Sequence, residues 1–281
     1  MKTIRMFNQD LLYGTIKQAM TFIFFVITVL VCINGANEYF ISLHAYGMTE
    51  GVGTFGDYVM YAFRGEHIYE QSSGSKFHIP IYWFAIQFFI ALTVGNYPSD
   101  DLASYGRMKI LKNGSRLRWL FSKIMWVMVH ILVCYGIIYL TIYIFCLMKG
   151  ADVRLSISTD IWYNTVYNLT TVPQKEVLVI GVILPILSTI AVSLFQTMLS
   201  IITQPQIGFT FTVCILIMST YWTKSIFVPN YTMWCRNSLI DPRGLDTFSG
   251  IILNVGIIII STAIMIKYII SCDIINKKTR I

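Results

Sequence analysis

Six apolar stretches recur along the chain, separated by segments in which polar and charged residues gather. They lie at about 19–41, 79–96, 117–147, 177–202, 207–228 and 250–272. Each is close to the roughly 20 residues that an α-helix needs to cross about 30 Å of hydrocarbon. The pattern therefore predicts an all-α integral membrane protein, with six transmembrane helices in a single domain that covers residues 1–281.

The first stretch is the least regular of the six. Its apolar run ends in Asn34, Gly35, Asn37 and Glu38, so its second half is polar. The charged leader and short apolar core also have features of a secretory signal with Ala36 at the cleavage site, but Asn34 stands where such a site wants a small residue. We therefore interpret this stretch as a retained span.

The composition agrees with a membrane protein. The 281 residues are 56% hydrophobic and 12% charged, whereas soluble domains have about 25% charged residues. The net charge of +7 would suit nucleic acid, but the charges lie between apolar blocks, and a basic membrane face is the better account, with no nucleic acid as partner. With both termini on one side, that side receives thirteen of the 21 lysines and arginines and the other side eight. Because cytoplasmic loops are enriched in these residues, both termini are predicted to be cytoplasmic.

The segment 97–116, between the second and third spans, is predicted to contain a short cytoplasmic helix. Ser99 suits the N-cap, and Asp100 and Asp101 lie in the first turn, where the helix dipole favours negative charge. Gly114 tolerates the left-handed conformation that ends a helix. Lipid phosphates would account for the basic residues of the segment, but acidic residues gain nothing from an anionic membrane. The mixture of charges therefore favours a protein partner.

The residues after Gly114 are predicted to anchor the third span. Ser115 can cap the next helix. Arg116 and Arg118 would then lie at headgroup depth and Trp119 at the membrane interface. These three residues are the predicted membrane-interface anchors.

Two further segments show the spacing of amphipathic helices. In residues 1–18, Ile4, Phe7 and Leu11 share one face, which predicts a cytoplasmic helix that lies in the interface or contacts a partner. Residues 55–63 show a similar pattern in the first outer loop, and we expect them to lie on the outer leaflet.

The outer segment 228–249, which precedes the last span, contains Pro229, Pro242 and Gly244. These residues argue against one straight helix. The segment is either a re-entrant excursion into the membrane or an ordinary outer loop.

Polar residues within the spans are candidates for lining a pathway. Glu38, Gln87 and Gln196 would each be costly in lipid, so they should face protein or water. Contacts between helices for the glutamines, and the aqueous interface for Glu38, explain them as well. In the fourth span, Gly181 and Pro185 predict a kink.

The sequence contains no motif for catalysis, metal binding or ATP binding. It has no G-x-x-x-x-G-K-[ST] phosphate loop, so ATP would have to be bound by another polypeptide. GVGTFG at 51–56 fits G-x-G-x-x-G, but no strand precedes it, and a dinucleotide site needs an α/β unit. The six cysteines form no C-x-x-C pair. We therefore predict no catalytic residue, no metal site and no cofactor in this chain, which is not expected to be an enzyme.

The order of these segments resembles that of the permease subunits of ABC type-2 transporters. The stretch YPSDDLASYGRMKILKNGSRLRWLFSKIMW at 97–126 is similar to the corresponding part of small permeases of Gram-positive bacteria, which lie beside an ATPase and often beside peptide or bacteriocin genes. The resemblance implies that the short helix is a coupling helix that docks into the ATPase, and that 228–249 re-enters the membrane. The residues that would face the ATPase are Asp100, Asp101, Tyr105, Gly106, Arg107 and Lys109.

The function implied by this resemblance is export across the cell membrane. The chain would be the permease subunit, paired with a second copy or a related permease. Two separate ATPase subunits would bind ATP and magnesium. The cargo would be peptide-like or amphipathic. The alternative is a non-transporting immunity or sensory protein that binds a peptide outside the cell.

Overall fold

A computed structural model describes residues 2–16, 18–46, 53–69, 77–95, 97–103, 106–108, 110, 115–162 and 174–271. This part of the chain is helical, which confirms the predicted fold class at that level. The elements are α1 (Lys2–Ile16), α2 (Ala19–Ala45), α3 (Phe55–Phe63), α4 (Ile81–Gly95), α5 (Tyr97–Ala103), α7 (Arg116–Lys149), α8 (Thr159–Trp162), α9 (Gln174–Leu178), the π-helix η2 (Val179–Ile183), α10 (Leu184–Ile202), α11 (Pro205–Tyr221), the 3-10 helices η3 (Val228–Thr232) and η4 (Trp234–Arg236), and α12 (Thr247–Ser271).

Among the residues that the structure describes, four helices are long and apolar enough to cross a membrane. They are α2, α7, α12 and the continuous helix Lys175–Ile202 that contains α10. These helices support an integral membrane protein. The two remaining predicted spans correspond to the shorter helices α4, of 15 residues, and α11, of 17 residues. The count of six spans stays a prediction.

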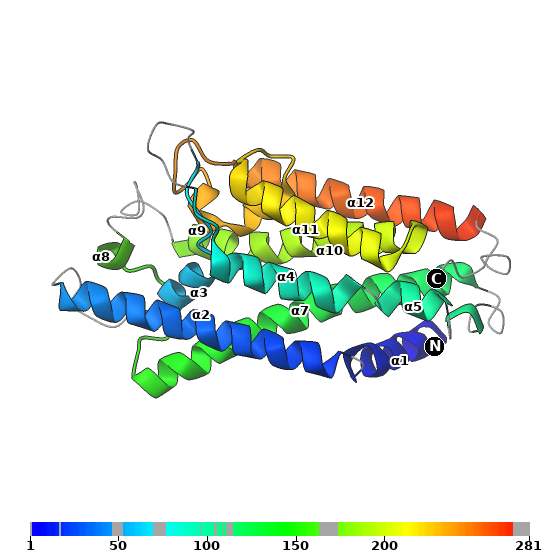
Figure 1. Ribbon diagram of the computed structural model, residues 1–281, viewed down its shortest axis with the longest axis horizontal. Coiled ribbons are helices and arrows are strands. Elements are labelled where there is room, and N and C mark those ends of the chain that lie inside the picture. The colour runs from blue at the N-terminus through cyan, green and yellow to red at the C-terminus, as the bar shows by residue number, and fades with distance from the viewer. Residues whose placement is uncertain are drawn as a thin grey trace.

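The long helices lie side by side along the long axis of the molecule (Figure 1). We call the end that holds α1, α5 and the last turn of α12 the proximal end, and the end that holds α3 and η3 the distal end. The helix that contains α10 is the most enclosed of the four, because its apolar stretch is 61% buried and those of the others are 22–33% buried. α10 therefore forms the centre of the bundle.

The start of α7 agrees with its sequence signals. The Ser115 side chain accepts a hydrogen bond from the Arg118 backbone N–H, as expected for an N-cap. At the other end, Gly150 adopts a left-handed conformation with φ 66°, which suits glycine. The caps delimit a helix of 34 residues.

The kink predicted at Gly181 and Pro185 takes the form of a widened turn. η2 is a π-helix, and Pro185 follows it directly at the start of α10. Proline has no backbone N–H, so the Gly181 carbonyl lacks the donor that a helix normally supplies four residues later. The Tyr139 hydroxyl on α7 donates to this carbonyl at 3.3 Å. A side chain from a neighbouring helix thus replaces the missing bond.

The α3 helix is buried, contrary to the expectation that residues 55–63 lie on the outer leaflet. It packs against α2, α7 and α4, and seven of its nine residues are buried. The Asp57 carboxylate, which is 0% exposed, accepts hydrogen bonds from the Thr54, Ser158 and Trp162 side chains at 2.7–3.0 Å. These bonds enclose the polar side of the helix in protein, which is why it does not lie at a lipid surface.

A glycine of the GVGTFG stretch allows α3 to pack closely against the backbone of residues 154–156. A Cβ atom on Gly56 would lie 2.9 Å from the Ser156 backbone nitrogen and carbonyl carbon. The Gly56 N–H donates to the Arg154 carbonyl at 3.1 Å. Glycine is therefore required here because two backbone segments touch.

The segment 228–249 is broken, as its prolines predict. It contains η3 and η4, and its residues from Val228 to Asn237 are buried at the distal end. The Arg236 guanidinium, which is 1% exposed, donates to the carbonyls of Ser219 and Thr220 in the last turn of α11. A cation is favoured at a helix C-terminus, where carbonyls lack helical donors. Whether the segment enters the membrane stays a prediction.

We predict that Arg236→Met destabilises the protein. The substitution leaves carbonyls at the end of α11 without donors, and the loss of a buried charged hydrogen-bonding partner costs about 2–5 kcal/mol. Thermal unfolding of the purified protein in detergent measures the effect. Arg154→Met is the matched control, because the Arg154 side chain is 78% exposed and its ion-pair partner Asp152 is 50% exposed. Equal melting temperatures for the two variants would contradict the role of Arg236.

Candidate functional site: a buried ion cluster

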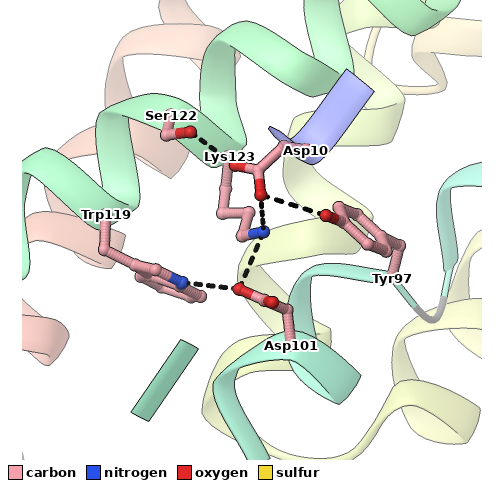
Figure 2. Close-up of polar contacts among 6 residues, drawn as sticks. All are labelled: Asp10, Tyr97, Asp101, Trp119, Ser122 and Lys123. Atoms are coloured by element: carbon pink, nitrogen blue, oxygen red, sulfur yellow. Dashed lines mark hydrogen bonds and ion pairs between the residues drawn. The ribbon is translucent and has the colours of Figure 1, made fainter. Parts of the chain in front are cut away.

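A cluster of polar side chains joins three helices at the proximal end (Figure 2). α1 contributes one residue, α5 two and α7 three. The members are Asp10, Tyr97, Asp101, Trp119, Ser122 and Lys123, and we refer to them as the ion cluster.

Lys123 is the centre of the ion cluster. Its side chain is 0% exposed, and its Nζ lies 2.8 Å from Asp10 Oδ1 and 2.8 Å from Asp101 Oδ2. Removing an ammonium ion from water costs several kcal/mol, so a buried lysine needs close and well-placed carboxylates. Lys123 therefore holds α1 and α5 to α7 through charge.

The two carboxylates have further partners. The Tyr97 hydroxyl donates to Asp10 Oδ1 at 3.0 Å, and the Ser122 hydroxyl donates to Asp10 Oδ2. The Trp119 indole N–H donates to Asp101 Oδ2 at 2.8 Å. These donors offset the second negative charge, because hydrogen bonds to a carboxylate stabilise its ionised form. The cluster has two carboxylates and one ammonium, and neutral donors complete it.

Aromatic rings enclose the ammonium ion. Lys123 Nζ lies 4.3 Å from the centre of the Tyr97 ring and 5.7 Å from that of Trp119, within the range of cation–π attraction. Tyr97 also packs on Trp126, with ring centres 4.6 Å apart. The rings exclude water, which strengthens the ion pairs they surround.

Helical spacing on α1 positions Asp10. Among residues 6–14, whose side chains are described, Met6, Asp10 and Gly14 are buried, each four positions from the next, so they form one stripe. The stripe runs along α7, because Asp10 meets Ser122 and a Cβ atom on Gly14 would lie 2.7 Å from the Trp126 indole nitrogen. Glycine at 14 therefore permits the close approach of the two helices.

This stripe differs from the apolar face predicted for residues 1–18. Phe7 and Leu11, which belong to the predicted face, are only partly buried, although they pack against the core. The side chain of Ile4 lies outside the described residues. The prediction missed the polar Asp10 because it searched for an apolar face.

The position of Asp101 corrects the expectation that it faces a partner. Its side chain is 8% exposed and bonded to Lys123 and Trp119 inside the chain. Gly106 lies against the same pair, since a Cβ atom there would be 2.6 Å from both Asp101 Oδ2 and Trp119 Nε1. Asp101 thus belongs to the ion cluster, and Gly106 packs against it.

The other residues predicted to face a partner are distributed differently. Asp100 is exposed and Arg107 is partly exposed. Met108, next to Arg107, is 67% exposed. Tyr105 and Lys109 lie outside the described residues. The accessible side of this segment therefore carries Asp100 and Arg107.

Two of the three predicted membrane anchors have other contacts. Trp119 is 0% exposed, so it lies in the ion cluster and not at a lipid interface. The Arg116 guanidinium donates to the carbonyls of Ile269 and Ile270 at 3.2 and 3.0 Å, and so caps the end of α12. Arg118 is exposed at the start of α7. Only Arg118 retains a position suited to lipid headgroups.

The three candidate pathway residues fall into two groups. Glu38 is exposed on α2 and accepts a hydrogen bond from Asn34 at 2.9 Å. Gln87 is 5% exposed on α4 and Gln196 is 0% exposed on α10. Both glutamines form hydrogen bonds between helices of the bundle, whereas Glu38 bonds within its own helix.

The ion cluster is suited to mechanical connection. Three of its four carboxylate oxygens, both of Asp10 and Oδ2 of Asp101, have donors from within the cluster, and the described residues contain no group of three or more His, Cys, Asp or Glu side chains that could hold a metal ion. Sequence reasoning missed Asp10, Tyr97, Ser122 and Lys123. The available signal was Lys123 in the largely apolar stretch FSKIMW at 121–126. It lies four residues, about one helical turn, after Trp119.

Comparisons with known proteins identify a family without a known function. The family model described as "Protein of unknown function (DUF2705)" matches residues 37–275. The match includes Asp101 and Lys123 but begins after Asp10. No curated protein and no solved structure matches the chain.

We predict that Lys123→Met lowers the stability of the protein by about 3–5 kcal/mol, because two carboxylates are left buried without their cation. Thermal unfolding in detergent, with Lys149→Met as the control, measures the loss. Lys149 is exposed at the other end of α7. Adding Asp10→Asn and Asp101→Asn to Lys123→Met should restore part of the loss, since these changes remove the unpaired charges. A Lys123→Met protein as stable as the control would show that the ion pairs do not form.

Proposed function

We propose that this chain, which belongs to the DUF2705 family of proteins of unknown function, is the membrane-spanning permease subunit of an ATP-driven ABC exporter. Separate ATPase subunits would bind ATP and magnesium, and the cargo would be peptide-like or amphipathic. The observation that carries the proposal is the attachment of α5 to α7 and α1 by buried ion pairs. A coupling helix must be attached rigidly to the helices that it moves.

A displacement of α5 would be transmitted to the rest of the bundle through α7. Lys123 lies near the start of α7, and Tyr135 lies about 18 Å farther along the helix at 1.5 Å per residue. The Tyr135 hydroxyl donates to the Pro185 carbonyl at 3.1 Å and lies 2.7 Å from the Thr189 hydroxyl, both on α10. A displacement of α5 would therefore reach the central helix α10, beside its widened turn.

The proximal end offers a surface that suits a protein partner. Asp100 and Met108 are exposed there and Arg107 is partly exposed, so acidic, basic and apolar groups occur together. A surface with this mixture is better suited to bind a protein than to bind an anionic lipid membrane. If this surface contacts a cytoplasmic ATPase, then α1 and the end of α12 are cytoplasmic too, because they lie at the same end (Figure 1).

The exporter would contain a second permease, either another copy or a related chain, in the cell membrane. Exposed apolar side chains on α2, α7 and α12 suit lipid or such a subunit. This part of the proposal rests on the family resemblance of the sequence.

We predict that the tagged protein, purified with the products of its neighbouring genes, carries an ATPase, and that Asp100→Ala with Arg107→Ala removes it. The double variant alters accessible charges and leaves Lys123 and its two carboxylates in place. Immunoblotting and ATP hydrolysis of the purified complex measure the association.

The matched control is Asp152→Ala with Arg154→Ala. This exposed acid–base pair lies at the distal end, with side-chain exposures of 50% and 78%. The control should retain the ATPase. Absence of any ATPase from the wild-type preparation would contradict the exporter and favour the non-transporting immunity or sensory protein. Equal retention by both double variants would contradict the assignment of this surface.

A further inference from the structure

The central helix α10 carries a row of buried polar side chains. Each is at most 2% exposed, although the helix crosses the middle of an apolar bundle. They are Ser188, Thr189, Ser193, Gln196, Thr197 and Ser200. Polar groups enclosed in this way need hydrogen-bond partners, because burying them without partners costs several kcal/mol.

Two groups in this row have unmet hydrogen-bonding capacity. Gln196 Nε2 donates to the Ala91 carbonyl on α4 at 2.9 Å, but Gln196 Oε1 accepts no hydrogen bond. The Ser200 hydroxyl, one helical turn farther on, has no partner either. By contrast, Gln87 uses both ends of its amide, with Tyr135 and Thr189. The unmet groups are therefore confined to the proximal half of α10.

Glycines on two neighbouring helices close tightly over these groups. A Cβ atom on Gly95, the last residue of α4, would lie 2.8 Å from Gln196 Nε2. A Cβ atom on Gly208 of α11 would overlap the Ser200 hydroxyl. We call Gly95, Gln196, Ser200 and Gly208 the α10 seam. Its close packing raises the cost of its unmet polar atoms, because nothing in this arrangement satisfies them.

The α10 seam lies next to the ion cluster. Gly95 precedes Tyr97 by two residues, and the Tyr97 hydroxyl is bound to Asp10. α5 also packs against α10. A movement of α5 would therefore be transmitted to the end of α4, where Gly95 packs on Gln196.

We propose that the α10 seam is a water-binding site that opens when α4 separates from α10. Water would then donate to Gln196 Oε1 and bond with the Ser200 hydroxyl, so hydration stabilises the open arrangement relative to the closed one. This inference deepens the proposed function, on which it rests, because it places an aqueous route for cargo inside one permease chain, between α4, α10 and α11.

The first test measures the closed arrangement. Ser200→Ala removes an unpartnered hydroxyl with little change of shape, so it should raise the melting temperature by about 2–4 °C. The control is Ser219→Ala, because the Ser219 hydroxyl is equally buried but donates to the Ile215 carbonyl. It should leave the melting temperature unchanged or lower it. A fall with Ser200→Ala equal to that of the control would overturn the proposal.

The second test measures water directly. Ser200→Cys is made with the native cysteines replaced by alanine and treated with a water-soluble methanethiosulfonate, which reacts with thiolates in contact with water. Asp152→Cys, at a 50% exposed position at the distal end, serves as the accessible reference, and Leu132→Cys, at a 51% exposed position on the apolar surface of α7, as the lipid-facing one. Ser200→Cys should react at least tenfold faster than Leu132→Cys, and faster still with ATPase and ATP present.

The possible results distinguish failure of the proposed water-binding site from failure of the proposed exporter function. Reaction at Ser200→Cys in a preparation without any ATPase supports the seam even though the exporter fails. Reaction as slow as that of Leu132→Cys, with and without ATPase and ATP, would overturn the seam even if the ATPase binds.

Discussion

A buried ammonium ion organises the proximal end of this protein. Lys123 is withdrawn from water, so it requires the carboxylates of both Asp10 and Asp101, and they require it. Because the three residues come from α7, α1 and α5, the separation of any one of these helices from the others breaks at least one of the two ion pairs. The need to keep these charges paired makes three segments, far apart in sequence, act as one unit, and the proposed coupling function follows from that unit.

The distal end follows the same rule with different groups. Asp57 is satisfied by neutral donors from residues 54, 158 and 162, and Arg236 by carbonyls at the end of α11. Each buried charge holds an irregular segment against a helix, because it cannot be left without hydrogen bonds. Between the two ends, contacts such as Tyr139 with Gly181 join α7 to the central helix.

The sequence was informative where the residues of a segment alone determine the structure of that segment. Apolar length predicted the long helices, Ser115 the start of α7, and Pro229 with Pro242 the broken outer segment. It was misleading where a distant partner decides burial. Asp101 and Trp119 lie in polar segments typical of a surface, and the nearby signal of their burial is Lys123, which follows Trp119 by four positions and pairs with Asp101. Amphipathic spacing likewise cannot distinguish lipid from protein, as in α3, although Thr54 and Asp57 form a capping box visible in the sequence.

The central claim is that Lys123 makes α1 and α5 one mechanical unit with α7. Hydrogen–deuterium exchange, read by mass spectrometry on wild-type protein and on Lys123→Met, tests it directly, because amide exchange reports local opening. The account predicts that amides of α1 and α5 both exchange faster in the variant, to a similar extent, while those of α3 are unchanged. Faster exchange in only one of the two helices, or in neither, would contradict it.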